Sequence, residues 1–418
     1  MNRIRFFNLE PWQRTLYVTF LVQMITAMGF SSIFPFLPNY VEALGSASGL
    51  SIELLSGLVF SSQAIAMMIT APVWGAIADR YGRKLMVLRA TFGGTVLLLL
   101  MAWVQNAEQL VLLRTIQGAV TGVLAANNAL VASVVPRERS GYAMGLLEVG
   151  LGAGLALGPV VGGITADLFG YAESFYITSG ALLLSGLLAL FFVHEPPLPT
   201  VPAHHTRQPM LQAMVAEWRH LLSNGGVAAT LFMRFMSQAG RLMIIPILPF
   251  IVSTLMRGEG AINTMTGIIS GVAYAATTLS AVYLGKLGDR IGHRSVLLAS
   301  LAASALIFIP QTFVTALWQF FALQIASGVA MGGMIPSISA LLATFVDHGE
   351  EGAVYGLDAS VNSAGRAIAP LLGAAVAFYF GQFANFAAVG VLFAIATLLG
   401  AYLLPIARPA PEPTPSSD

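Results

Sequence analysis

The chain has 418 residues, of which 56% are hydrophobic and only 9% are charged, and its mean hydropathy is +0.78. Soluble domains are usually about 45–50% apolar and about 25% charged, so the composition excludes an ordinary soluble protein and indicates a membrane protein. The net charge is +1 without a basic tract, so we expect no nucleic-acid partner. The absence of cysteine excludes disulfides and thiolate chemistry.

Twelve apolar runs are each long enough to cross a bilayer as a helix, which takes about 20 residues. Strands of a membrane barrel are about 10 residues long and alternate in polarity, so we predict an all-α protein. The first run is too long for a cleaved signal peptide, and we expect it to remain as a helix. The predicted spans are Thr15–Val41, Leu54–Ala78, Leu85–Val104, Gln109–Val135, Tyr142–Leu168, Ser174–Val193, Val227–Val252, Ile262–Leu284, Ser295–Phe313, Leu317–Val346, Ala353–Phe380 and Phe383–Leu404.

Lys and Arg between the spans gather on one side, and the loops of the opposite side hold only Arg257. The positive-inside rule makes the rich side cytoplasmic, which predicts a multi-pass protein of the cell (inner) membrane with both termini inside. The residues on this side are Arg3, Arg5, Arg14, Arg80, Arg83, Lys84, Arg89, Arg137, Arg139, Arg207, Arg219, Lys286, Arg290, Arg294 and Arg408.

The spans form two sets of six, which predicts an N-terminal bundle in residues 1–193 and a C-terminal bundle in residues 227–404. Residues 194–226 are predicted to form a cytoplasmic linker, proline-rich at first and then an amphipathic helix over Met210–Leu222 on the inner membrane surface. The Pro- and Ser-rich tail 405–418 is predicted to be disordered.

Landmarks of the first set recur about 210 residues later in the second. We therefore predict two six-helix halves related by a repeat, an architecture in which secondary transporters bind substrate at midplane between the halves. The recurring pairs are Pro35 with Pro246, Pro38 with Pro249, Gly118 with Gly328, Gly122 with Gly332, Pro159 with Pro370 and Gly162 with Gly373.

One charged turn follows the second span of each half, in residues 75–84 (GAIADRYGRK) and 285–294 (GKLGDRIGHR). A tight turn between membrane helices needs glycine for its backbone and charge that stays at the interface. The first turn resembles the signature between helices 2 and 3 of the major facilitator superfamily of transporters. In that family its Asp and Arg bind the neighbouring half and lock the cytoplasmic side. The resemblance therefore implies a cytoplasmic gate of Gly75, Asp79, Arg80, Gly82, Arg83, Asp289, Arg290 and Arg294.

Two further motifs of that family have counterparts here. Arg114-Thr-Ile-Gln117-Gly118 resembles its second motif, R-x-x-q-G. Gly154, Gly158-Pro159 and Gly162 resemble the motif that marks antiporters, and small residues at this spacing let helices approach closely. We expect this stretch to be a helix-interface motif without substrate contact.

The resemblance covers nearly the whole chain and is strongest to bacterial multidrug efflux proteins, as in Phe34–Pro38 and Val135–Gly141. It implies proton-driven export of hydrophobic drugs by alternating access, with a small-molecule substrate, protons and the lipid bilayer as partners. No obligatory protein partner is predicted. A nucleotide-binding loop is not visible, and no cofactor is predicted.

Two acids lie inside the apolar runs, Glu148 in the fifth span and Asp358 in the eleventh. A carboxyl group at membrane depth is a candidate proton carrier, so both are predicted to couple protons to transport. The alternative is that each forms an ion pair of the gate, with Arg83 or Arg294 as the partner.

The deeper polar side chains are mostly positive, which leaves an anionic or zwitterionic substrate open. Candidates for the substrate pathway are Gln23, Phe34, Arg114, Gln117, Arg241 and Arg366. Alternatively, Arg114 reaches the outer surface, and the other two arginines bond backbone carbonyls freed near Pro246 or Pro370. Many drug/proton antiporters of the superfamily carry an acid in helix 1, and this chain has none there.

Three alternatives to drug efflux follow. The same fold could export an organic anion, a sugar or a lysophospholipid. An enzyme is not expected, because no nucleophile and base stand together at depth, and a channel or sensor scaffold does not suit the repeat with its gate motifs. All six His residues lie in predicted cytoplasmic segments without metal-ligand spacing, so no metal site is predicted.

Overall fold

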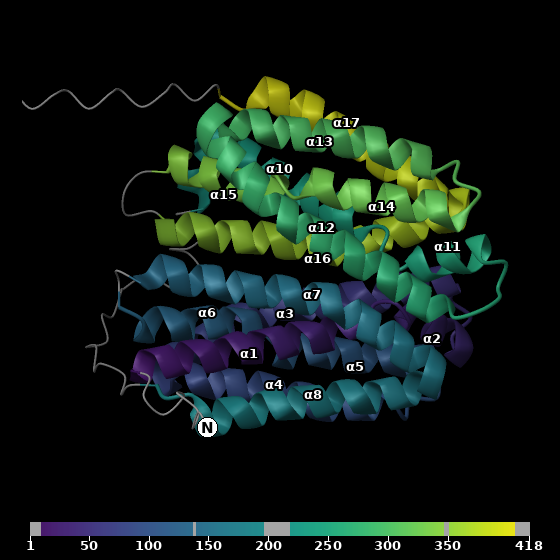
Figure 1. Ribbon diagram of the computed structural model, residues 1–418, viewed down its shortest axis with the longest axis horizontal. Coiled ribbons are helices and arrows are strands. Elements are labelled where there is room, and N and C mark those ends of the chain that lie inside the picture. Colours follow the sequence, from purple (N-terminus) through teal and green to yellow (C-terminus); the bar gives the residue numbers. More distant parts are fainter. Residues whose placement is uncertain (1–9, 137–138, 196–217, 347–350, 406–418) are drawn as a thin grey trace, which may run out of the picture.

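The computed structural model describes residues 10–136, 139–195, 218–346 and 351–405, and in these ranges the chain is helical apart from turns and short loops. Figure 1 shows the helices running side by side in one bundle. Up to residue 195 they are α1 (Pro11–Ser32), α2 (Leu37–Leu44), α3 (Ile52–Tyr81), α4 (Arg83–Met101), α5 (Ala107–Val120), α6 (Val123–Val134), α7 (Ser140–Phe169) and α8 (Tyr171–Phe192). From residue 225 they are α10 (Gly225–Leu242), α11 (Leu248–Leu255), α12 (Ile262–Ile291), α13 (His293–Gln311), α14 (Leu317–Met331), α15 (Met334–Phe345), α16 (Glu351–Phe380) and α17 (Ala384–Leu403).

Ten helical segments in the described part of the chain are long and apolar enough to cross a membrane, and they coincide with ten of the predicted spans. The other two predicted spans, Gln109–Val135 and Val227–Val252, correspond to the pairs α5/α6 and α10/α11. Residues 218–223 are helical, whereas the rest of the predicted amphipathic helix and most of the tail lie outside the described residues.

Four of the predicted spans are each divided between two helices, a break that was not predicted: Thr15–Val41, Gln109–Val135, Val227–Val252 and Leu317–Val346. Pro38 and Pro249 stand in the first turns of α2 and α11, where a missing N–H does no harm but a continuing helix would lose a bond. Gly122 breaks the fourth span with φ 134°, a left-handed conformation that favours glycine.

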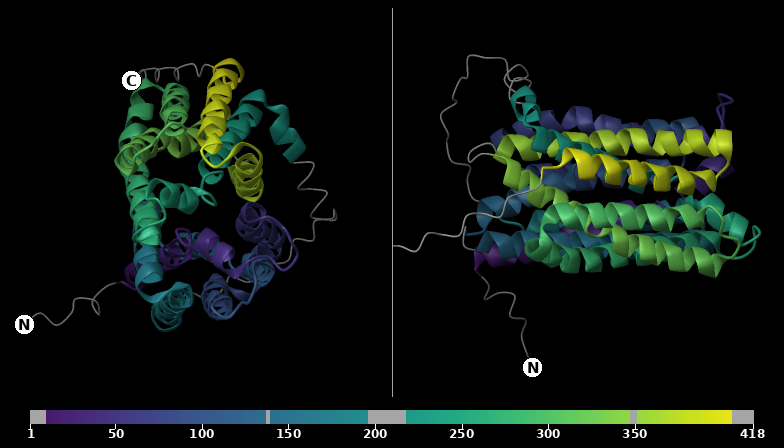
Figure 2. Two further views of the ribbon diagram at one scale, coloured as in Figure 1. Left: turned by 90° about the vertical axis from the view of Figure 1, so that its right-hand side faces the viewer. Right: turned by 90° about the horizontal axis from the view of Figure 1, so that it is seen from above.

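Helices α1–α8 pack against one another, and so do helices α10–α17, so we call them the first and second groups. The buried apolar clusters stay within one group each. Equivalent elements match in length: α3 and α12 have 30 residues, α4 and α13 have 19, and α7 and α16 have 30. The groups meet along two lines, where α7 packs on α12 and α3 on α16, and Figure 2 shows them side by side.

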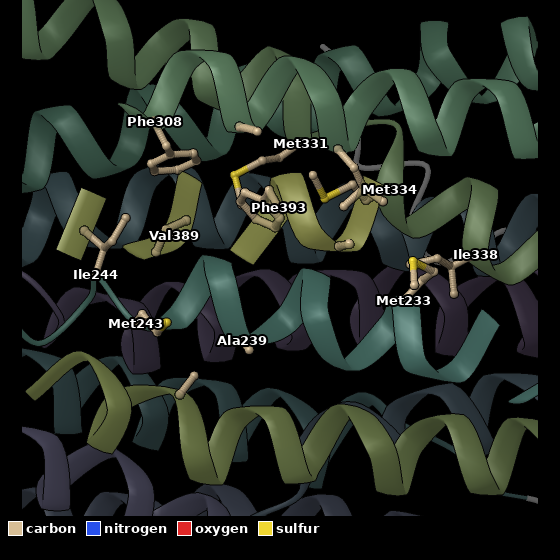
Figure 3. Packing of buried hydrophobic residues seen from close by; sticks show 14 of the residues in the cluster. Met233, Ala239, Met243, Ile244, Phe308, Met331, Met334, Ile338, Val389 and Phe393 are labelled. Carbon is tan, nitrogen blue, oxygen red and sulfur yellow. The ribbon is translucent and has the colours of Figure 1, made fainter. Parts of the chain in front are cut away.

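A sulfur- and ring-rich core fixes α10 in the second group, as Figure 3 shows. Met233 and Ala239 of α10, and Met243 just after it, are buried in it, and the Phe308 and Phe393 rings lie 5.8 Å apart. Arg234, Gln238 and Arg241 recur at helical spacing on another face of the same helix, where Gln238 is buried and the two arginines are partly exposed. The core thus sets which side chains of α10 remain available for polar contacts.

The bundle has two distinct ends (Figure 1). One end holds the two charged turns, around Gly82 (φ 101°) and Gly292 (φ 90°), and we call it the charged-turn end. The opposite end, which we call the far end, holds α2 and α11, which contact each other across the two groups.

Candidate functional site

Helix α7 carries the glycine motif, and its glycines lie directly against α1. A Cβ on Gly158 would overlap the carbonyl oxygen of Met28, and Gly154 and Gly162 meet the backbone of Met24 and Ser32 in the same way. Only a residue without a side chain permits this approach. The motif therefore holds two helices of the first group together.

A second face of α7 lies against α12 of the second group. Gly163 meets the Asn263 backbone, Gly267 meets the Pro159 carbonyl, and further along a Cβ on Gly152 would crowd Thr278. The two groups are therefore in backbone contact from the far end to the middle of α7.

The groups separate toward the charged-turn end. Gly145 and Gly141 continue the Gly152 face of α7, about two and three turns further on, and a Cβ there would meet nothing within 4 Å. On the other seam, Gly57 touches α16, whereas Gly75, about five turns later on the same face, lies in open space. The interface is therefore closed at the far end and open at the charged-turn end.

The hydrogen bonds recorded for the charged turns stay on the side of the chain from which each turn comes. The Glu195 carboxylate accepts hydrogen bonds from the backbone N–H of Arg83 and Lys84, each 2.8 Å long. Arg294 donates to the carbonyls of Ala401 and Leu404. The side chain of Asp79 lies outside what is described, and the gate role of these residues stays a prediction.

Arg114 is buried to 1% exposure in α5 and does not reach the outer surface, contrary to one alternative. Its Nε donates to the Val59 carbonyl at 3.2 Å and its Nη1 to Gln117 Oε1 at 2.7 Å. The Phe60 ring lies 5.8 Å from the guanidinium and 5.7 Å from the Phe34 ring. Arg114 Nη2 and Gln117 Nε2 are buried without a hydrogen-bond partner, so two donors remain unused.

Three arginines from both groups and one tyrosine form a central cationic cluster. Arg366 interacts electrostatically with Arg114 and with Arg241, and Tyr274 interacts with both Arg241 and Arg366. Arg241 Nη2 donates to Gln238 Oε1 at 3.2 Å. Among the described residues Arg241 makes no hydrogen bond to the backbone carbonyls near Pro246 or Pro370 that the alternative expects. Hydrogen bonds from Arg366 are not found among the described residues.

A small hollow of about 10 Å³, room for roughly one water molecule, lies beside this cluster in the second group. Polar side chains of α10 line one wall, and apolar side chains of α14 and α15 line the other. The lining residues are Arg234, Ser237, Gln238, Arg241, Met331, Met334 and Ile335. The lining is mixed in polarity, and the hollow is too small in this conformation to hold a drug-sized molecule.

The two candidate acids have different surroundings. Asp358 Oδ2 accepts a hydrogen bond from Arg234 Nη2 at 2.9 Å, so its partner is Arg234 rather than Arg294. Glu148 is exposed and makes no ion pair with any described residue. It stands one turn from Gly152 on the face of α7 that looks into the opening between the groups.

Gln23, the polar residue of the first span, is completely buried. It donates to the Leu147 carbonyl at 3.3 Å and accepts from Asn127 Nδ2 at 3.1 Å. The contact joins three helices beside Glu148, and sequence reasoning missed Asn127. Asn127 Oδ1 is buried without a partner.

Sequence reasoning also missed the polar contact that closes the far end. Asp167 in α7 accepts hydrogen bonds from Asn263 Nδ2 (2.7 Å) and from the Thr264 backbone N–H (2.6 Å), at the start of α12. Asn263 Oδ1 accepts in turn from Asn39 in α2 at 2.8 Å. Asp167 sits at the end of a predicted span, where an acid looks like an ordinary interfacial charge, and only the helix pairing gives it a partner.

Within the described ranges, no group of three His, Asp or Glu side chains is placed to hold a metal ion. Membrane-length helices with acids and arginines between two packed groups, open at one end, define a multi-pass membrane transport protein. Residues 19–233 and 230–418 match the Major Facilitator Superfamily. The chain belongs to this superfamily, whose members are transporters of small molecules rather than enzymes.

Known relatives and structures agree with this assignment. The multidrug resistance protein MdtG of Salmonella dublin is 38% identical over 371 residues, which cover 88% of this chain and 90% of that protein. The nucleoside transporter NupG has a similar fold, with a TM-score of 0.78, 15% identity, and coverage of 94% of this chain and 100% of that one. An inward-facing, occupied structure of a bacterial homolog of the human lysosomal transporter Spinster has a TM-score of 0.77 and 12% identity, and the match covers 94% of this chain and 97% of that one.

Proposed function

We propose that this chain exports hydrophobic drugs or other small amphiphiles in exchange for protons, by alternating access. The observation that carries the proposal is the 38% identity to MdtG, a protein named for multidrug resistance, over most of both chains. In this proposal the twelve spans form two six-helix halves in the inner membrane, with both termini in the cytoplasm.

Alternating access is supported by the way the groups separate. The contacts of Gly163, Gly267 and Gly57 lie toward the far end, and the open positions Gly75 and Gly141 toward the charged-turn end. With the charged-turn end in the cytoplasm, this conformation would receive a drug from the cell interior. The charged turns would then form contacts between the halves only after rocking, when the cytoplasmic side closes.

Proton coupling is assigned to Glu148, Asp358 or both. Glu148 faces the opening without a partner among the described residues, so protons from the cytoplasm can reach it in this conformation. Asp358 is held by Arg234, which also lines the hollow beside α10. A proton on Asp358 would weaken this ion pair and change the charge that the substrate meets. Binding of the proton and binding of the substrate would thereby be linked.

Export of an organic anion is the second candidate, and the central cationic cluster favours it. Arg114, Arg241 and Arg366 interact with one another or with Tyr274, and none of the three pairs with an acid in the described part of the chain. Unused donors on Arg114 and Gln117 would suit a carboxylate or phosphonate group. This candidate shares the fold and the cycle and differs only in the charge of the substrate.

Transport in proteoliposomes tests the proposal. Purified protein is reconstituted, a pH gradient is imposed, and uptake of a fluorescent lipophilic cation is compared with uptake of a fluorescent organic anion. Gradient-dependent movement of the cation, lost on adding a protonophore, supports drug/proton exchange. Movement of the anion alone, reduced by Arg366→Gln, would replace it with the second candidate.

A further inference from the structure

Helix α12 begins without a cap of its own. Its N-cap residue is Ala261, which has no side-chain oxygen to accept hydrogen bonds from the N–H groups of the first turn. The Asp167 carboxylate of α7 accepts these bonds instead, from the Asn263 N–H at 3.4 Å and from the Thr264 N–H at 2.6 Å. An N-cap side chain normally bonds these same positions of its own helix. Asp167 therefore caps a helix of the other group.

This cap lies at the end of the packed seam between α7 and α12. Asn263 is only 6% exposed, donates from Nδ2 to Asp167 at 2.7 Å and accepts from Asn39 of α2 at 2.8 Å. Its backbone lies against Gly163, one turn before Asp167. Separation of the two helices at the far end would break these contacts together, so the contacts stabilise the conformation that is closed there.

Helices α7 and α12 end in the same pattern, an aspartate three residues before a glycine with positive φ. The pairs are Asp167 with Gly170 (φ 105°) and Asp289 with Gly292 (φ 90°). Both helices have 30 residues, and they run in opposite directions along their seam, so the two aspartates stand at opposite ends of one helix pair.

The register of the seam places Asp289 opposite the start of α7. Gly152 of α7 meets Thr278 of α12, and eleven residues further along the two helices stand Gly141 and Asp289. Gly141 is the second residue of α7, just as Asn263 is the second residue of α12. Asp289 therefore stands to α7 as Asp167 stands to α12.

The contact is not made at the charged-turn end, where the groups are apart. The Asp289 side chain is 72% exposed, and its Oδ1 lies 3.2 Å from His293 Nε2 of the same group. A Cβ on Gly141 would meet nothing within 4 Å. The N-cap residue Arg139 makes no side-chain hydrogen bond to the first turn of α7. The start of α7 thus lacks the cap that the start of α12 has received.

We propose that Asp167 and Asp289 are alternating latches of the α7/α12 pair, each of which caps the first turn of the other helix in one conformation. Asp167 holds the far end shut in the observed conformation, and Asp289 holds the charged-turn end shut after rocking. The proposal rests on the alternating access of the proposed function and adds residues that stabilise each of its two conformations. The N–H donors of a helix start favour an ionised carboxylate, so the exchange needs no protonation.

Distances between spin labels test the proposal, because the chain has no native cysteine. Leu50→Cys with Glu259→Cys reports the far end, and Ala132→Cys with Ala343→Cys reports the charged-turn end. All four positions are exposed and lie outside α7 and α12. Both pairs are measured in lipid nanodiscs at one pH, without drug and without a gradient. The readout is thus independent of the substrate and of proton coupling.

Removal of each latch should shift the conformations in opposite directions. Asp167→Asn should raise the ratio of open to closed far ends about tenfold or more, because a neutral amide accepts from N–H groups less strongly. Asp289→Asn should lower this ratio, and the double variant should return it toward that of wild type. Glu173→Gln is the matched control, since this exposed acid at the far end lies beside Gly170 of its own group, and it should leave the ratio unchanged.

Ala261→Asp separates the latch from a role in folding. A carboxylate at the N-cap position can cap α12 from within its own group, and it repels Asp167. The helix therefore keeps a cap while the contact between the groups is lost. We expect the far end to open as in Asp167→Asn, with a melting temperature above that of Asp167→Asn.

Two results would overturn the proposal, and they differ in what they leave standing. If wild type shows two populations at each end and neither Asp167→Asn nor Ala261→Asp changes them, the latch is wrong and alternating access stands. If every protein shows one unchanging distance at each end, the latch falls together with alternating access.

Discussion

Asp358 and Arg234 form an ion pair inside the second group, with 2.9 Å between Oδ2 and Nη2 and side-chain exposures of 10% and 15%. The pair joins α16, which contacts the first group, to α10, which lines the hollow. The remaining atoms Asp358 Oδ1 and Arg234 Nε are buried without a hydrogen-bond partner. Each side chain therefore depends on the other for its charge compensation.

Removal of one member should consequently destabilise the protein. Asp358→Asn leaves the Arg234 charge buried without an opposite charge, and we expect a loss of about 1–3 kcal/mol in detergent. The double variant Asp358→Asn/Arg234→Gln should recover part of this loss, because no buried charge remains. Thermal unfolding of the four proteins of this cycle measures the effect, and equal stability of Asp358→Asn and wild type would mean that the pair contributes nothing.

The glycine motif of α7 gives a second test. Gly158→Ala places a methyl group against the Met28 carbonyl, and the overlap should cost about 1–3 kcal/mol. Gly180→Ala in α8 is the matched control, since a Cβ there meets nothing within 4 Å, and its effect should stay below about 1 kcal/mol. Melting temperatures in the same detergent compare the two, and similar shifts would argue against close packing of α7 on α1.

A disulfide between the groups should stop the cycle. A Cβ on Gly57 would lie 3.0 Å from the Ala374 Cβ, close enough for a disulfide after a small adjustment. Gly57→Cys/Ala374→Cys should therefore cross-link and lose transport until it is reduced. The control pair Gly75→Cys/Gly356→Cys lies where the groups are apart, and it should not cross-link in this conformation. Full transport by the oxidised first pair would contradict alternating access.

Glu108 lies just before the predicted span Gln109–Val135. We expect its hydrogen bonds to make the order of residues 46–48 at the far end depend on pH. Its carboxylate accepts hydrogen bonds from the Ser48 hydroxyl and from the backbone N–H groups of Ala47 and Ser48, and these lower the pKa of Glu108 from 4.5 to about 2. The stabilising effect is complete above the usual pKa of 4.5 and disappears as the pH falls through about 2.

Hydrogen exchange of residues 46–48 measures this effect. Wild type should keep its protection at pH 4, whereas Glu108→Gln should lose most of it at every pH, because the neutral amide accepts these bonds less strongly. Equal protection in the two proteins would show that the carboxylate does not order this loop.

The sequence predicts the long helices well, because a membrane span needs a length and polarity that few other segments have. It predicts the breaks less well. Pro38 and Pro249 are a signal for the starts of α2 and α11, but prolines are common within membrane helices, as Pro159 in the middle of α7 shows.

The interaction partners of the polar residues were harder to predict than the depth of these residues in the membrane. Arg234 and Asp358 lie at similar depth in the sequence, which is a usable signal, but only the packing of α10 on α16 pairs them. Asp167 gave no signal of its partners, since these belong to the first turn of a helix in the other group. Contacts between the two groups depend on the conformation of the transporter, and the pattern of residues along the sequence does not specify that conformation.

In the proposed cycle, drug movement and proton movement are linked through an intramembrane carboxylate. The internal pH of proteoliposomes, followed with a trapped dye after a drug gradient is applied without a pH gradient, measures this link. We expect the drug gradient to drive protons in the opposite direction in wild type, and Glu148→Gln or Asp358→Asn to abolish proton movement. Drug movement with no change of internal pH in wild type would contradict it.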